Sequence, residues 1–171
     1  MRAIRLYIAS SFRNLHAVRL FGRALCGPDF EILDWTARAR PPEGLAPAER
    51  RVWMDTDHGG EVFTFCEQAC RDADIVVYLG VSGQDAGVEV GIAWGCGVPV
   101  LGVRGPLEAP GLMLYGAGRV WVEQIEEALA LLRNAAGERG KMPDGTGRPE
   151  DVLLALYRER LSAGRVQASS S

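Results

Sequence analysis

A single carboxylate stands in the most apolar stretch of this chain. Residues 86–103 read AGVEVGIAWGCGVPVLGV, and Glu89 carries the only charged side chain among them. An ionised carboxylate in such surroundings costs several kcal/mol of folding free energy unless something stabilises or uses it. Because a carboxylate in a dry crevice can serve as a nucleophile or as a general base, Glu89 is the first candidate for a catalytic residue.

The segments before Glu89 predict where it lies. The apolar run 75–80 is typical of a buried strand, and the loop VSGQDAG (81–87) leads into a helix that carries Glu89. Glu89 therefore follows the carboxyl end of a strand, which is where ligands bind in open α/β sheets. Gly87 and Gly91 flank it and remove side-chain bulk, so a ligand could approach the backbone closely.

Strand-like and helix-like segments alternate along the chain. We expect strands at 3–9, 30–35, 74–80, 98–103 and 119–122, and helices at 12–25, 60–72, around Glu89 up to 95–97, and 123–133, with a less regular stretch at 36–59. The alternation predicts an α/β fold with a doubly wound parallel sheet of about five strands. We expect one domain over 1–136, then a flexible linker (137–149), a last helix (150–163) and a frayed tail (164–171).

Polar side chains gather at the predicted strand ends. The candidates for substrate binding are Ser10, Ser11 and Arg13 after the first strand, Asp34 at the end of the second, and Ser82, Asp85 and Gly87 after the third. Serine hydroxyls and backbone N–H groups at a helix N-terminus form an anion site, to which Arg13 could add a bidentate contact. The alternative is that both serines only cap the helix and that Arg13 is solvated.

Tyr7, on the first strand, is the second candidate for a catalytic residue. Its hydroxyl could orient the Glu89 carboxylate and keep it ionised. The alternative is that Tyr7 is packed there for core reasons alone. His58 could belong to a lid over the site, or to an exposed turn, which we favour.

Charge and composition exclude several classes of function. The net charge is −3 and no basic run appears, which argues against a nucleic-acid polymer as a partner. Of the 19 Lys and Arg residues only Lys141 is a lysine, so Schiff-base and P-loop chemistry are excluded. The first strand is followed by IASSFRN, which lacks the glycines of a dinucleotide site, and we expect no cofactor.

Metal and membrane sites are not expected either. The 4 cysteines, at 26, 66, 70 and 96, have apolar neighbours and form no CxxC motif, which predicts buried reduced thiols and no metal. The run 86–103 contains glycines, a proline and Glu89, so it predicts a buried helix, turn and strand rather than a membrane span. The N-terminus shows no signal-peptide pattern, which predicts a cytoplasmic protein.

Four segments in order carry a family resemblance. LYIASSFRN, EILDW, CRDADIVVYLG and GVEVGIAWGCGVPVLGV together resemble the nucleoside 2-deoxyribosyltransferase family, and its relatives that hydrolyse nucleoside 5′-monophosphates, over about residues 3–103. The resemblance implies a flavodoxin-like fold and cleavage of the bond between a base and a (deoxy)ribose. It maps the family's nucleophilic glutamate onto Glu89 and its strand-one tyrosine onto Tyr7, and a glycosyl-enzyme ester would be resolved by a second base or by water.

The same resemblance assigns sugar or phosphate binding to the loop 82–87, and Asp85 could contact the base or a sugar hydroxyl. The chain departs from the family at Cys66, where many relatives have an aspartate, and at Gly83, where they have Asp or a phosphate-binding Ser. We expect a nucleotide N-glycosidase more than a base-exchanging transferase, because Arg13 and the serines favour a phosphorylated substrate. The alternative is a non-catalytic nucleotide-binding or sensor module.

We also expect a homodimer or higher homo-oligomer. Members of the resembled family build their sites near subunit contacts, and the apolar stripe Leu153, Leu156 and Tyr157 of the last helix would suit a partner surface. Packing of that helix on its own sheet is the alternative.

Overall fold

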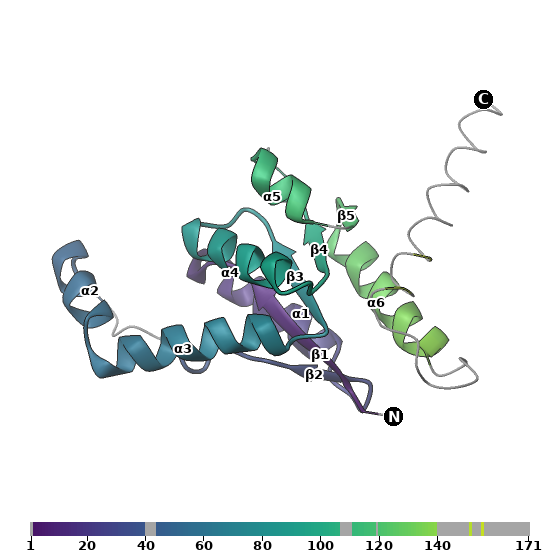
Figure 1. The fold of residues 1–171 in the computed structure, drawn as a ribbon, viewed down its shortest axis with the longest axis horizontal. Helices are drawn as coiled ribbons and strands as arrows, with labels where there is room; N and C mark the ends of the chain where they lie inside the picture. The colour runs from purple at the N-terminus through teal and green to yellow at the C-terminus, as the bar shows by residue number, and fades with distance from the viewer. Residues whose placement is uncertain are drawn as a thin grey trace.

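A five-stranded parallel sheet forms the centre of the molecule (Figure 1). The computed structural model describes residues 2–39, 44–106, 111–118 and 120–139, together with Asp151 and Ala155. The strands are β1 (Ile4–Ala9), β2 (Phe30–Ile32), β3 (Ile75–Leu79), β4 (Val100–Val103) and β5 (Val120–Val122), in the order β2-β1-β3-β4-β5. Every pairing between neighbours is parallel, so the predicted doubly wound sheet is confirmed, with the strand order of flavodoxin-like folds.

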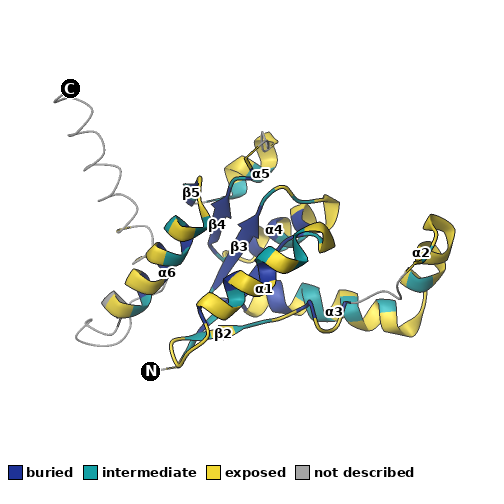
Figure 2. Ribbon diagram, turned by 180° about the vertical axis from the view of Figure 1, so that it is seen from behind, coloured by how far each residue is buried: buried dark blue, intermediate teal, exposed yellow. Residues whose placement is uncertain are grey.

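Helices cover both faces of this sheet. They are α1 (Leu15–Ala24), preceded by the short 3₁₀ helix η1 (Phe12–Asn14), then α2 (Pro47–Met54), α3 (Asp57–Asp72), α4 (Gln84–Gly95), α5 (Leu112–Ala117) and α6 (Ile125–Arg139). α3 and α4 pack together on the face seen in Figure 1, and α1 and α6 contact each other on the face seen in Figure 2. All five residues of β3 are buried, as expected for a strand covered on both sides.

The structure differs from the predicted elements mainly in the stretch 36–59. Residues expected to be irregular form α2 and the start of α3, because Pro47 occupies the first position of α2 and the Glu49 side chain accepts a hydrogen bond from the Ala46 N–H at 2.7 Å. Thr56 caps α3 by accepting from the Gly59 N–H at 3.2 Å.

Smaller differences concern element ends. β2 stops before Asp34, because the Asp34 carboxylate accepts the N–H of Thr36 at 2.7 Å and turns the chain. The short α5 lies where a loop was expected, and α6 continues past the expected boundary at 136 to Arg139. The expected last helix and tail lie outside the described residues, except that Asp151 and Ala155 are helical.

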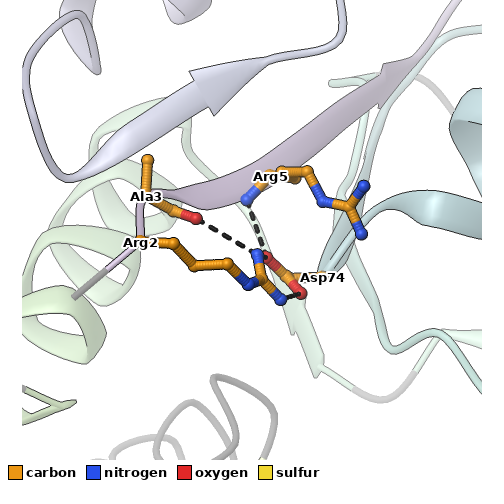
Figure 3. A network of polar contacts seen from close by, with 4 residues as sticks. All are labelled: Arg2, Ala3, Arg5 and Asp74. Atoms are coloured by element: carbon orange, nitrogen blue, oxygen red, sulfur yellow. Dashed lines mark hydrogen bonds and ion pairs between the residues drawn. The ribbon is translucent and has the colours of Figure 1, made fainter.

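An ion pair between Arg2 and Asp74 lies at the N-terminal ends of β1 and β3 (Figure 3). Both terminal nitrogens of Arg2 donate to Asp74 at 2.6 Å, and the Arg5 backbone N–H donates to the same carboxylate at 2.8 Å. Partial burial of Asp74 acts to raise its carboxyl pKa, but the hydrogen bonds from Arg2 and Arg5 outweigh that effect and lower the pKa. The carboxylate therefore stabilises the folded state while it is ionised.

Replacing Asp74 by alanine is expected to lower the free energy of unfolding by about 1–3 kcal/mol at pH 7, since charge-assisted hydrogen bonds are lost. The pKa of Asp74 is lower in the folded than in the unfolded chain, so its contribution is present above the unfolded value near 3.8 and disappears as the pH falls below it. Urea denaturation at pH 7 and pH 3 measures both effects. Asp72→Ala, at the exposed end of α3, is the control, and an equal loss in both variants would contradict the assignment.

Candidate functional site

A cavity of about 400 Å³ lies beyond the carboxyl ends of β1 and β2. α3 and α4 form two of its walls, and the loop after β1 and the segment after β2 complete it. Its lining residues are Ser10, Ser11, Phe12, Trp35, Ala39, Trp53, Met54, Gly59, Val62, Phe63, Cys66, Glu67, Asp85, Val88, Glu89 and Ile92. The cavity is at the point where the strand order reverses between β1 and β3, the usual ligand position in this class of sheet.

Glu89 and Tyr7 meet at the base of this cavity. The Tyr7 hydroxyl donates a hydrogen bond of 2.6 Å to Glu89 Oε1. Tyr7 is fully buried in β1, where its pairing with Val76 of β3 fixes the direction of its side chain toward α4. Glu89 is in the second turn of α4, which packs on β1 and β3. The two residues that the sequence predicts as catalytic are therefore in direct contact.

The second oxygen of Glu89, Oε2, is buried and has no hydrogen-bond partner among the described residues. Burial raises the pKa of Glu89 to about 8, the Tyr7 hydrogen bond acts in the opposite direction, and the nearby Asp85 carboxylate raises it further. Glu89 is also a lining residue of the cavity, and burial of an oxygen without a partner is unfavourable, so a group from outside the chain that reached this carboxyl group would be favoured. Perturbed carboxyl groups of this kind are concentrated at functional sites.

The hydroxyl and thiol beside Glu89 are both held in their protonated forms. Burial is the main cause of the raised pKa of Tyr7, and the neighbouring Glu89 charge adds to it. Burial also raises the pKa of the Cys66 thiol, which lies in α3 next to Tyr7 and lines the cavity. Neither group is a strong acid in this environment.

Serine side chains from two strand ends form a second cluster at the cavity. Ser10 Oγ lies 3.0 Å from the Leu79 carbonyl, to which it donates, and 2.9 Å from Ser82 Oγ. Ser82 Oγ also accepts from the Ser11 N–H at 3.2 Å, whereas Ser11 Oγ is buried without a partner in the described part of the chain. Ser11 is at the N-cap position of η1, but neither serine makes a capping hydrogen bond through its side chain, so the geometry gives the capping alternative no support for the serines.

Four of the residues predicted to bind substrate do not line the cavity. Ser82 is linked to it only through the contacts of its hydroxyl with Ser10 and Ser11. Arg13 is exposed in η1 and does not line it. Asp34 holds the turn after β2 and lines a separate hollow of about 280 Å³, while its neighbour Trp35 faces the cavity. Gly87 lines a groove on the outer side of α4. Their roles in substrate binding stay predictions without support from the geometry.

An aromatic rim was not predicted. Trp53 of α2 and Phe63 of α3 line the cavity, and Phe63 is 64% exposed. Trp35 and Phe12 form the opposite side with their rings edge to face, 5.0 Å between centroids. His58 contacts the Trp53 ring edge to face, at 5.8 Å, and is exposed. The sequence signal for this rim is Pro47, because proline is common at the first position of a helix and so indicates the start of α2, the helix that carries Trp53.

Other expectations concern metals, thiols and membranes. No group of three or more His, Cys, Asp or Glu residues in the described part of the chain could hold a metal ion. The cysteines are free, but only Cys70 is buried, and Cys26 and Cys96 are exposed, so the expectation of four buried thiols is wrong. Over the described ranges, no helix is both long and apolar enough to span a bilayer.

Comparison with known proteins gives a match at the level of fold. No family model matches the chain, and no curated protein matches its sequence. A conserved protein from Enterococcus faecalis V583 superposes with a TM-score of 0.54 at 15% identity, over 75% of this chain and 96% of that protein. A 2-deoxyribosyltransferase from Bacillus psychrosaccharolyticus gives 0.48 at 16% identity, over 73% and 90% of the two chains. A CMP N-glycosidase from Clostridium botulinum gives 0.46 at 13%, over 75% and 98%.

The raised pKa of Glu89 predicts how the free energy of unfolding changes with pH. Its folded-state pKa, about 8, is above the unfolded value of 4.5, so ionisation favours unfolding and stability falls as the pH rises from 4.5 to 8. Glu89→Gln, which cannot ionise, is expected to be more stable than the parent at pH 8.5, by roughly 2–4 kcal/mol, and nearly equal at pH 4.5. Urea denaturation across this range tests it. Glu126→Gln, exposed on α6, is the control, and parallel curves for Glu89→Gln and the parent would contradict the assignment.

Proposed function

We propose that the chain cleaves the N-glycosidic bond of a nucleoside or nucleoside 5′-monophosphate, with Glu89 as the nucleophile. The contact between the Tyr7 hydroxyl and Glu89 Oε1 carries the proposal, because it orients a carboxyl group of a cavity-lining residue whose other oxygen, Oε2, is buried without a partner. The family resemblance of residues 3–103 assigns the same two residues to the same step. The aromatic rim provides flat apolar surfaces on which a base can stack.

The reaction begins with attack of Glu89 Oε2 on the anomeric carbon. The bond from that carbon to the base nitrogen breaks, its electron pair leaves with the base, and a glycosyl ester forms on Glu89. Tyr7 keeps its hydrogen bond to Oε1 throughout and so fixes the orientation of the carboxylate. Water then attacks the same carbon and releases the carboxylate, or an acceptor base does so in a transferase.

Glu89→Gln is expected to lose base release by at least about a thousandfold, since the nucleophile is removed. Tyr7→Phe is expected to lose about 10- to 100-fold, the value of one hydrogen bond to a charged group. In the parent, kcat/KM should rise with pH to a plateau above about 8, because only ionised Glu89 attacks. Tyr7→Phe should move this inflection to higher pH, because the hydrogen bond that lowers the Glu89 pKa is gone.

The assay is chromatographic detection of free base from a panel of nucleosides and 5′-monophosphates. Exchange with an added base that outpaces release without it would indicate a transferase. Full activity in Glu89→Gln would refute the assignment of Glu89 as the nucleophile.

Cys66, at a place where relatives carry an acid, favours a second candidate function, a non-catalytic nucleotide-binding module. That module would show a thermal shift with nucleotide, as binding to the native state requires, and no base release.

We also propose that the chain forms a homo-oligomer through the outer side of α4. A groove of about 740 Å³ between α4 and α5 has only apolar lining residues and glycines, and Leu112 and Met113 beside it are 85% and 82% exposed. Exposed apolar patches of this kind are typical of interaction sites. Gly87 and Gly91 leave the α4 backbone accessible, so α4 of a second copy could approach closely about a twofold axis.

Gly91→Arg tests this interface. Among the described residues, no atom lies within 4 Å of a Cβ placed at Gly91, so the fold should tolerate a side chain there, while a second copy would be displaced. Light scattering after size-exclusion chromatography is expected to show the parent as an oligomer and the variant as a monomer. Gly137→Arg, also free of close neighbours but on α6, should keep the parent mass. A monomeric parent would contradict the interface.

A further inference from the structure

The cavity that holds Glu89 is lined by several acidic side chains and, among the described residues, by no basic one. Glu67, Asp85 and Glu89 line it, and none of the described lining residues is Arg, Lys or His. Glu67 forms an ion pair with Arg71, but Asp85 and Glu89 have no ion pair within the described ranges. Partly enclosed carboxylates attract cations and repel a phosphate, because their field is poorly screened there. Glu89, whose pKa is raised to about 8, adds to this field in its ionised form, which a bound cation favours.

The aromatic rim adds a second attraction for positive charge. Phe12 and Trp35 form one side of the cavity, and Trp53 and Phe63 lie on the α2 and α3 side. Aromatic faces bind organic cations through the ring quadrupole, and tryptophan does so best. A flat cationic ring inserted between these side chains would therefore gain both stacking and charge attraction.

The groups beside Glu89 are poor proton donors to a departing base. Burial raises the pKa of both Tyr7 and Cys66, and Tyr7 already donates its hydrogen to Glu89. A neutral nucleoside needs a proton on its base for rapid departure, since an anionic base is a poor leaving group. A base that already carries a positive charge leaves as a neutral molecule and needs no acid.

We propose that the preferred substrates are nucleosides with a positively charged base, such as a pyridinium or an N-alkylated purine. This inference rests on the proposed N-glycosidic chemistry for its reaction and on the carboxylate and aromatic lining for its ligand class. It replaces the expectation of a phosphorylated substrate, because Arg13, which favoured a phosphate, is exposed and away from the cavity.

The charges balance in this reaction. The bond between the anomeric carbon and the cationic ring nitrogen breaks, and its electron pair neutralises the ring. Glu89 Oε2 forms the ester bond, so a cation and a carboxylate become two neutral products. Water then attacks the anomeric carbon, the ester bond breaks, Glu89 regains its negative charge, and the proton from water passes to solvent.

Binding is tested with a pair of ligands that differ in charge alone. Nicotinamide riboside carries a pyridinium, and benzamide riboside is its neutral carbon-linked isostere. The measurement is calorimetry on Glu89→Gln, a variant without turnover. The Kd of nicotinamide riboside is expected to be about tenfold lower than that of benzamide riboside. Equal affinities, or tighter binding of the 5′-phosphate of either ligand than of the ligand itself, would overturn the inference.

Asp85 is expected to account for part of the preference. In the Glu89→Gln background, Asp85→Asn should reduce the ratio of the two Kd values about threefold or more, while Glu126→Gln should leave it unchanged. An undiminished ratio in the Asp85 variant would contradict a role for the cavity carboxylates.

Turnover separates this inference from the proposed function. The parent is tested with nicotinamide riboside, 7-methylguanosine, adenosine, cytidine and their 5′-monophosphates, in ribo and deoxyribo forms, and each kcat/KM is divided by the uncatalysed rate constant. Higher values for the two cationic nucleosides support the inference. Higher values for neutral nucleosides or monophosphates overturn it and keep the proposed function. Preferred binding of the cation without any base release would keep the ligand class and overturn the proposed function.

Discussion

The carboxylate of Glu89 loses most of its hydration when α4 packs against β1 and β3, and the fold has to compensate for that loss. One compensation is internal, because the fully buried Tyr7 donates to Oε1. The other oxygen, Oε2, is buried without a partner among the described residues. A ligand that presents a positive or partly positive atom would complete the arrangement. Stability and function thus place opposite demands on the same side chain.

The parallel sheet makes this contact possible. β1 and β3 are neighbours in register, and β2 and β4 lie on opposite sides of them, so the connections after β1 and β3 diverge and leave room between α3 and α4. Ser10 from one connection and Ser82 from the other meet there at 2.9 Å. At the other end of the same two strands, Asp74 joins them through Arg2 and the Arg5 backbone (Figure 3). The register that positions Tyr7 is thereby held at both ends.

The strands could be predicted from the sequence, because buried parallel strands are continuous apolar runs. The pair Tyr7 and Glu89 could be predicted as well, because Glu89 is the one charged residue in the most apolar stretch of the chain. The prediction failed where a single side chain determines the local structure. Asp34 and Trp35 are neighbours, yet only Trp35 faces the cavity, since the side chain of Asp34 closes the turn after β2. α2 is short, and its start depends on Pro47. The aromatic rim was missed with it.

The surroundings of α4 explain why its sequence is apolar on nearly every side. Glu89 faces the cavity, Ala86, Val90 and Ala93 are buried against the sheet, and Gly87 faces the groove shared with α5. Beyond Gln84 and Asp85 at its start, α4 has Glu89 as its one polar side chain, and its faces are used in three different ways, so it has no simple amphipathic pattern. Its outer face is as apolar as its inner face, although much of it is exposed. A partner protomer on that face would bury the apolar surface and hold α4, and with it Glu89, firmly against the sheet.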